Sequence, residues 1–279
     1  MLPTGDRLHQ GNTCVSQRVE RRSVTVESSA SDGPRVALVT GGGSGIGKAS
    51  VLALARVGHT VLVVDRDGDS AVEVAQAAAS SGTDSVGLCV DVTDREAVTR
   101  VFREYQQKGM VPDVVVNCAG LYDKDSDGAI HTVPVETFDR IMDVNLRGTY
   151  HVCAAAIPGM LEKGRGSIVN IASRAAVNGI SHHAYSAAKG AVAAMTRSMG
   201  VSYAEFGIRC NALAPGPIDT PMIPWASEPT GWADRLQTVP AKRPGRPEEV
   251  ASLIVYLASD DSAYVNAQVL SIDGGAAAC

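Results

Sequence analysis

The chain has 279 residues, of which 45% are hydrophobic and 20% are charged, so it can bury a sizeable core and wholesale disorder is excluded. Its net charge of -5 disfavours general nucleic-acid binding, which depends on cationic contacts to phosphates. No apolar run approaches the ~20 residues of a membrane span, so we expect neither nucleic acid nor a membrane as a partner.

Residues 1–33 differ in character from the rest of the chain. They are polar, mix both charges and carry no sustained hydrophobic period, which predicts a mobile N-terminal tail. Met1-Leu2-Pro3 leads into this polar sequence without the apolar core of a secretory signal. We therefore expect one folded domain over residues 34–279.

From residue 35 onward, short β-branched runs alternate with helical stretches. The strands are expected at 35–40, 60–65, 85–91, 113–117, 167–172, 209–213 and 268–272. The helices are expected at 45–57, 70–80, 95–108, 135–162, 183–205 and 247–258. The strand runs are almost continuously apolar, as in strands covered on both faces. This order predicts an α/β fold, a Rossmann-type doubly wound parallel sheet of about seven strands with helices on both faces.

The six cysteines form no CxxC pair and show no zinc-ligand spacing. Four of them lie in apolar stretches and are predicted to be small buried hydrophobic residues, which favours a reducing, cytoplasmic compartment. The adjacent pair His182-His183 has no carboxylate or thiolate close by in the sequence. It indicates polarity at the surface or in a substrate loop, and we expect no metal site.

A glycine-rich segment from Thr40 to Gly47 lies between the first strand and the first helix. Glycines allow a tight turn and close backbone approach, and the helix N-terminus offers unpaired N–H groups to a pyrophosphate. Any tight turn can use glycine, but this one is followed by an acidic strand end about 20 residues on, which strengthens the interpretation. The residues expected to contact a dinucleotide are Gly41, Ser44, Gly45, Ile46 and Gly47.

Asp65 closes the second strand. A carboxylate there can accept hydrogen bonds from both adenosine ribose hydroxyls and would repel a 2′-phosphate. Arg66 could pair with such a phosphate, but the aspartate lies closer to the ribose in this architecture, and the loop offers Ser44 rather than Lys or Arg. We expect NAD rather than NADP; the alternative is that Asp65 merely ends a strand.

Tyr185 and Lys189 are four residues apart at the start of a predicted helix, which puts both on one face. A free tyrosine has a pKa of ~10, and a neighbouring ammonium or a positive nicotinamide ring would lower it. Ser173 follows the fifth strand, whose carboxyl end faces the ligand crevice, and can hydrogen-bond the same substrate oxygen. A YxxxK pair alone is weak evidence, and Ser173 could be a plain turn serine.

Together these segments resemble the short-chain dehydrogenase/reductase family, from Arg35 to Gly275. Thr40–Gly47 is similar to the family's TGxxxGxG loop, and Asn117–Gly120 to its NNAG segment, where Cys118 departs from the pattern. The resemblance implies a catalytic tetrad of Asn145, Ser173, Tyr185 and Lys189, in which Asn145 supports a water that links Lys189 to solvent. It also implies cofactor contacts from Asp91, Val92, Asn117, Ala119, Gly120, Tyr185, Lys189, Pro215, Gly216, Ile218 and Thr220.

The reaction implied by the resemblance is reversible hydride transfer between a nicotinamide and a secondary alcohol or ketone. An NADPH-dependent 3-oxoacyl-(acyl-carrier-protein) reductase is the alternative, because Arg243–Glu249 is similar to those enzymes. Two positions that hold carrier-docking arginines there are Pro158 and Val201 here, which, with Asp65, favours an NAD-dependent dehydrogenase. A non-catalytic NAD-binding scaffold is a third possibility, which a broken tetrad would support.

The resemblance also implies a homotetramer, formed by helices 135–162 and 183–205 on one face and by helix 247–258 with the last strand on another. These surfaces could instead pack within one subunit. Residues 220–240 follow the segment expected to hold the nicotinamide, are rich in proline and contain both tryptophans, Trp225 and Trp232. We expect a substrate lid there; the alternative is that the tryptophans serve packing or a subunit interface.

Overall fold

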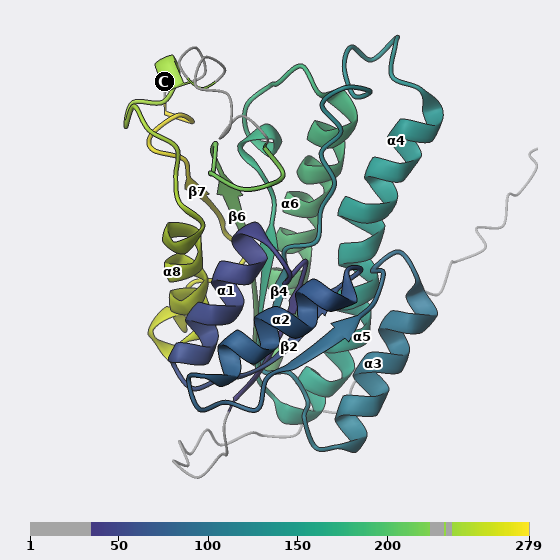
Figure 1. Ribbon diagram of the computed structural model, residues 1–279, viewed down its shortest axis with the longest axis vertical. Coiled ribbons are helices and arrows are strands. Elements are labelled where there is room, and N and C mark those ends of the chain that lie inside the picture. Colours follow the sequence, from purple (N-terminus) through teal and green to yellow (C-terminus); the bar gives the residue numbers. More distant parts are fainter. Residues whose placement is uncertain (1–34, 224–231, 233–235, 279) are drawn as a thin grey trace, which may run out of the picture. The chain divides into compact units, whose positions relative to one another are not determined.

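The computed structural model describes residues 35–223, residue 232 and residues 236–278 (Figure 1). The tail expected at residues 1–33 lies outside the described residues. So does most of the segment expected to form a lid, including Trp225. The described part of the folded domain thus begins at residue 35.

One parallel sheet of seven strands forms the centre of the domain. The strands are β1 (Val36–Thr40), β2 (Thr60–Asp65), β3 (Val86–Cys89), β4 (Val114–Asn117), β5 (Gly166–Ile171), β6 (Ile208–Pro215) and β7 (Val269–Ile272). Their order in the sheet is β3-β2-β1-β4-β5-β6-β7, so the chain moves outward in one direction from β1 and then in the other from β4. The predicted doubly wound α/β fold is confirmed.

Helices cover both faces of this sheet (Figure 1). They are α1 (Gly45–Arg56), α2 (Gly68–Ala79), α3 (Arg95–Gln107), α4 (Val135–Met142), α5 (Gly148–Lys163), α6 (His183–Tyr203) and α8 (Pro247–Ala258). Within the described part of the chain, no helix is both long and apolar enough to cross a membrane.

The strand β1 shows how the sheet separates two cores. Ala37 and Val39 pack with α1, α2 and α8, whereas Val36 and Leu38 pack with α3 and α5. All five of its residues are buried, which explains why the strand reads as continuously apolar rather than alternating. The edge strands β3 and β7 are only partly buried, in contrast to the expectation for every strand.

The edge position of β3 also corrects the expectation for the cysteines. The thiols of Cys153 and Cys210 are buried, but Cys118 is half-buried and Cys89, at the end of β3, is exposed. The four cysteines that the structure describes are free thiols. Their apolar neighbours in the sequence therefore indicated burial correctly for Cys153 on α5 and Cys210 on the inner strand β6, but not for Cys89 on the edge strand β3.

The single helix expected over 135–162 is interrupted. A π-helical turn over Asp143–Arg147 separates α4 from α5. The side-chain amide of Asn145 donates to the carbonyl of Ile141 at 2.9 Å, and the Thr149 hydroxyl donates to the carbonyl of Asn145 at 2.8 Å. Such side-chain bonds compete with the α-helical ladder, and π turns of this kind are frequent at functional sites.

Asp113 ties together the amino ends of three strands. Its carboxylate is 7% exposed and accepts from the Val36 amide, Lys163 Nζ and Arg165 Nε, each at 3.0 Å. Burial opposes ionisation, but the Val36 amide and the two cations outweigh it, so the pKa of Asp113 lies below its ordinary value. The ionised carboxylate is therefore a structural element of the sheet.

We predict that Asp113→Ala lowers the free energy of unfolding by about 3 kcal/mol at neutral pH, because two cations and an amide lose their buried partner. Since the folded pKa is depressed, this contribution is present above the unfolded pKa and disappears as the pH falls through the folded one. Urea denaturation at a series of pH values measures it. The control is Asp260→Ala, whose carboxylate is 84% exposed in its pair with Arg35. An equal loss in both variants would contradict the role of Asp113.

Candidate active site

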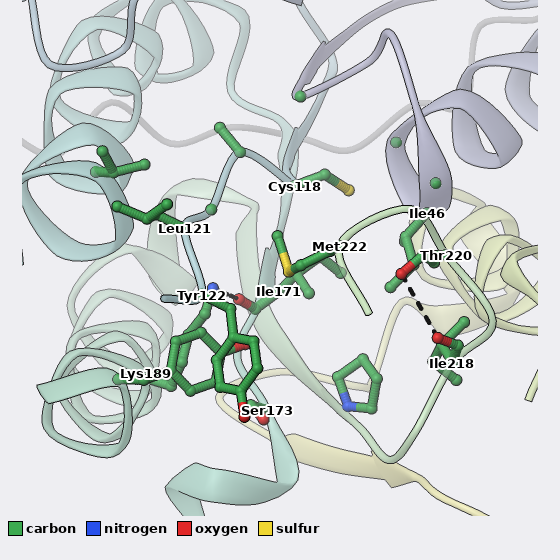
Figure 2. A pocket seen from close by; sticks show the side chains of 18 of the residues that line it. Ile46, Cys118, Leu121, Tyr122, Ile171, Ser173, Lys189, Ile218, Thr220 and Met222 are labelled. Carbon is green, nitrogen blue, oxygen red and sulfur yellow. Dashed lines mark hydrogen bonds between the residues drawn. The ribbon is translucent and has the colours of Figure 1, made fainter. Parts of the chain in front are cut away.

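The carboxyl ends of the strands open onto a pocket of about 450 Å³. It lies between the loops that follow β1 and β4, where the order in which strands are added to the sheet reverses. Open α/β sheets bind ligands at this point. Figure 2 shows Tyr122, Ser173 and Lys189 on one side of this pocket and Ile46, Ile218 and Thr220 on the other. The pocket thus joins residues from across the sequence.

The glycine loop forms a tight cradle at one end of the pocket. Gly41 has a positive φ of 63°, and a Cβ there would lie 2.8 Å from the backbone nitrogen of Ala119. A Cβ on Gly47 would lie 2.0 Å from the carbonyl oxygen of Gly41. Only glycine fits these two positions, so the loop stays close to the start of α1.

The start of α1 fits an anion. Gly45, Ile46 and Gly47 line the pocket, and in the described structure the side chain of Ser44 makes no capping hydrogen bond to this helix. The first-turn N–H groups and the positive end of the helix dipole are therefore available to a phosphate. The cradle fits the pyrophosphate of a dinucleotide.

Asp65 is held beside this loop at the end of β2. One carboxylate oxygen accepts from the Gly43 amide and the other from the Asp67 amide, both at 3.0 Å. A Cβ on Gly43 would lie 3.0 Å from the same carboxylate, so the loop and the acid pack directly together. This arrangement presents a fixed negative charge next to the anion cradle.

Most of the other residues expected to bind the cofactor line the same pocket. They are Arg66, Asp91, Val92, Ala119, Gly120, Pro215, Gly216, Ile218 and Thr220. Asn117 does not line it: its side chain is buried and donates to Asn170 Oδ1 at 2.8 Å. That amide joins β4 to β5 beneath the pocket, so the structure gives it a supporting role in place of the expected contact.

Ser173, Tyr185 and Lys189 meet at the opposite end of the pocket. Both hydroxyl-bearing side chains line this part of the pocket, and Lys189 Nζ lies 5.7 Å from the centroid of the Tyr185 ring. The same ammonium group donates to the carbonyl of Ile171 at 2.8 Å and is almost wholly buried. Two hydroxyls and an ammonium group thus converge on one small region.

Burial, rather than the ammonium group, dominates the acidity of this cluster. It raises the pKa of Tyr185 to about 12, although the nearby Ser173 hydroxyl acts in the opposite direction. It lowers the pKa of Lys189 to about 8. The lowered tyrosine pKa that the sequence suggests is therefore not a property of the protein alone.

Asn145 lies in the π-helical turn behind the pocket and is fully buried. Its side-chain amide donates to the carbonyl of Leu121 at 2.8 Å and accepts from the Leu121 amide at 3.2 Å. A Cβ on Gly120 would lie 3.0 Å from Asn145 Oδ1 and 3.4 Å from Lys189 Nζ, which puts both side chains beside one glycine. Asn145 thus supports the wall of the pocket next to Lys189.

The sequence interpretation missed several residues of the pocket wall. Tyr122 packs edge-on against Tyr185, with ring centroids 5.1 Å apart, and its hydroxyl lies 3.1 Å from a ring nitrogen of His182. Leu121, which was also missed, adds apolar surface, whereas Met222 and Ile223 belong to the segment expected to form the lid. The one available signal was position, because Leu121 and Tyr122 directly follow Gly120 and His182 precedes Tyr185 by three residues.

The beginning of the expected lid borders the pocket, through Thr220, Pro221, Met222 and Ile223. Trp232 is buried, with 9% of its surface exposed. Among the described residues, no group of three or more histidine, cysteine or acidic side chains is arranged to hold a metal ion.

We predict that the destabilising effect of burying the Lys189 ammonium group is relieved as the pH rises. Its folded pKa of about 8 lies below the ordinary 10.5, so the unfolded chain holds this proton more tightly. Between these values, the free energy of unfolding should rise with pH in the native protein relative to Lys189→Met. Urea denaturation from neutral pH upward measures the difference, with the exposed Lys124→Met as control. A difference independent of pH would contradict the buried ammonium.

Comparison with known proteins agrees with this geometry. A family model described as enoyl-(acyl carrier protein) reductase matches residues 41–277. The chain is 39% identical over 243 residues to 2-(R)-hydroxypropyl-CoM dehydrogenase of Xanthobacter autotrophicus, covering 86% of this chain and 97% of that protein. It is 38% identical over 245 residues to a 3-oxoacyl-(acyl-carrier-protein) reductase of Thermotoga maritima, with coverages of 86% and 97%.

A solved structure of another protein shares the fold of this chain. The gluconate 5-dehydrogenase from Burkholderia cenocepacia, in complex with NADP and tartrate, matches with a TM-score of 0.83 and 30% identity. The match covers 88% of this chain and 96% of that one. With its doubly wound sheet, its glycine cradle and these relatives, the chain belongs to the short-chain dehydrogenase/reductase family.

Proposed function

We propose that this protein is an NAD(H)-dependent oxidoreductase that interconverts a secondary alcohol and a ketone. The observation that carries the proposal is the convergence of Ser173, Tyr185 and Lys189 at one end of a pocket whose other end is an anion cradle. A nicotinamide cofactor, when bound, supplies or accepts the hydride. The chain's own residues bind and orient the reactants and move the proton.

In this proposal the hydroxyl of Tyr185 exchanges a proton with the substrate oxygen. With its pKa raised to about 12, Tyr185 is protonated at neutral pH and ready to donate in the direction of ketone reduction. Ser173, which lines the same end of the pocket, orients the same substrate oxygen. In the direction of oxidation, Lys189 Nζ at 5.7 Å from the tyrosine ring favours the tyrosinate by its charge.

Lys189 has a second role in this proposal, as a holder of the cofactor ribose. Its burial and its bond to the Ile171 carbonyl fix the ammonium group in one place, beside Gly120 and Asn145. Asn145 would support a water that links Lys189 to solvent, as the family resemblance implies. The remaining contacts to the cofactor would come from the loop at Gly41–Gly47 and from the residues that line the pocket after β3, β4 and β6.

The preference for NAD rests on Asp65. Its carboxylate is fixed by the amides of Gly43 and Asp67, so it cannot swing away without loss of both hydrogen bonds. A 2′-phosphate on the adenosine ribose would meet this negative charge. Arg66 is exposed beside it and is the residue of this chain through which NADP binding would arise.

The second candidate is a 3-oxoacyl-(acyl-carrier-protein) reductase, favoured by the identity to the Thermotoga maritima enzyme. Pro158 on α5 and Val201 on α6 are both exposed, at the positions that the sequence comparison expects to carry docking arginines. Neither can pair with an acidic carrier protein. A non-catalytic scaffold is disfavoured because all four tetrad residues are present.

We also propose a homotetramer. Val135, Tyr150 and Leu161, on the two helices around the π turn, are 68%, 48% and 39% exposed. Val201 on α6 and Tyr256 on α8 are 75% and 40% exposed. These apolar side chains lie on the helices expected to form subunit contacts.

The free thiols favour a reducing compartment, and we propose the cytoplasm. We further propose that residues 1–33 are a tail outside the catalytic domain and that a lid begins near Thr220.

We predict that Tyr185→Phe lowers kcat at least about a hundredfold while the Kd for NAD stays unchanged, because only the proton-transfer hydroxyl is removed. The assay follows reduced nicotinamide with the best substrate from a screen of alcohols, polyols, sugars and hydroxysteroids. Acetoacetyl thioesters with NADH or NADPH test the second candidate in parallel. Tyr264→Phe, at a fully exposed tyrosine, is the control. Substantial turnover by Tyr185→Phe would reject this residue as the proton donor.

We predict that NAD binds at least about tenfold more tightly than NADP, which corresponds to about 1.4 kcal/mol. Asp65→Ala should narrow that ratio, because it removes the charge that repels the 2′-phosphate. Titration with each cofactor measures both Kd values. Asp69→Ala removes a nearby exposed charge from the first turn of α2 and should leave the ratio intact. Equal affinities in the unaltered protein would refute the NAD preference.

A further inference from the structure

The first turn of α6, which carries Tyr185, is capped by a distant part of the chain. In the described structure its N-cap residue, His182, makes no side-chain capping bond. Asp127 provides the cap instead: one carboxylate oxygen accepts from the Ala184 amide at 3.0 Å and the other from the Tyr185 amide at 2.9 Å. The His183 amide reaches the Gly128 carbonyl at 3.4 Å.

The carboxylate of Asp127 is nearly inaccessible to solvent, with the residue 3% exposed. A buried carboxylate is costly unless it is well hydrogen-bonded. Here it meets two backbone N–H groups at the positive end of a helix of 21 residues, which is a favourable place for a negative charge. Because the two N–H groups of Ala184 and Tyr185 are what makes burial of this carboxylate favourable, Asp127 fixes the position of the backbone that carries them.

The loop that carries Asp127 is itself braced on its other side. The Asp127 amide donates to the Asp123 carbonyl at 3.0 Å, and Asp123 forms an ion pair with Arg140 on α4. At the start of the loop, both backbone groups of Leu121 bond to the Asn145 side chain. The loop over residues 121–128 therefore joins the π-helical turn to the first turn of α6.

We propose that Asp127 is a positioning residue that sets the backbone under Tyr185, and thereby the place of its hydroxyl relative to the substrate oxygen. Its bond to the Tyr185 amide acts on the same residue that the proposed function uses for proton transfer, so the catalytic consequence rests on that function. Lys189 lies one turn further along and has its own anchor at Ile171. Loss of Asp127 should therefore disturb turnover far more than cofactor binding.

The test compares Asp127→Ala and Asp127→Asn with Asp125→Ala. Asp125 is an exposed carboxylate in the same loop and serves as the matched control. Asparagine keeps one acceptor oxygen and should rescue part of the effect. Two quantities are measured: kcat per NAD-binding site with the best alcohol of the screen, and hydrogen exchange of the peptide that contains residues 183–185.

For Asp127→Ala we expect kcat to fall about a hundredfold, the scale of a small misplacement of a reacting group. The Kd for NAD should stay within about threefold, because the substitution removes no contact to the cofactor. A tenfold change in Kd, about 1.4 kcal/mol, would require the loss of such a contact. Exchange in residues 183–185 should accelerate at least about fivefold, as for one lost hydrogen bond. Asp127→Asn should lie between this variant and the unaltered protein.

The proposal is overturned if kcat per NAD-binding site is unchanged, if exchange is unchanged, or if Asp125→Ala behaves in the same way. If Asp127→Ala does not fold, the asparagine variant gives the decision by the same two measurements. Failure of the proposed function would look different: Tyr185→Phe would keep its turnover, while the exchange experiment would still report whether Asp127 holds the helix start.

Discussion

The parallel pairing of β1 with β4 is the constraint on which the site depends. Thr40 pairs with Asn117 at the carboxyl ends of these strands, and the Thr40 hydroxyl accepts from the Ala119 amide at 3.1 Å. The loops that follow the two strands are thereby in contact. They approach so closely at Gly41 that a side chain there would collide with the backbone of Ala119. The anion cradle after β1 and the wall after β4 are two sides of one pocket because of this pairing.

The proposed chemistry depends on a balance between burial and charge. Burial keeps Tyr185 protonated and brings the pKa of Lys189 to about 8, so the protein by itself holds the proton on the tyrosine. The ammonium group of Lys189 lies over the tyrosine ring, 5.7 Å from its centroid. In the proposed mechanism, the direction of proton transfer is therefore set by which reactants are bound.

The sequence predicts what depends on local pattern. The inner strands are continuously apolar because both of their faces are covered. The glycines at Gly41–Gly47 predict a tight turn because they lie between a strand pattern and a helix pattern. Asp65 and Ser173 could be assigned to the pocket because Asp65 ends one strand and Ser173 follows another at the same edge of the sheet.

What the sequence could not predict depends on contacts between distant segments. The π turn at Asn145 arises from bonds to Ile141 and Leu121, and a helical pattern contains no sign of it. The capping of Tyr185 by Asp127 joins residues 58 positions apart. The side chain of Asn117 was expected in the pocket but lies beneath it, because its amide donates to the Asn170 side chain on the neighbouring strand β5. The raised pKa of Tyr185 is likewise a consequence of burial, which composition does not reveal.

The central claim is that the pocket transfers a hydride from a carbinol carbon, and isotope transfer tests it most directly. The best alcohol of the screen is prepared with deuterium on its carbinol carbon and incubated with the protein and NAD, and the reduced nicotinamide is weighed by mass spectrometry. The account predicts that the deuterium is recovered in the reduced cofactor. Formation of reduced nicotinamide without deuterium, or no reduced nicotinamide from any alcohol, polyol, sugar or hydroxysteroid, would contradict it.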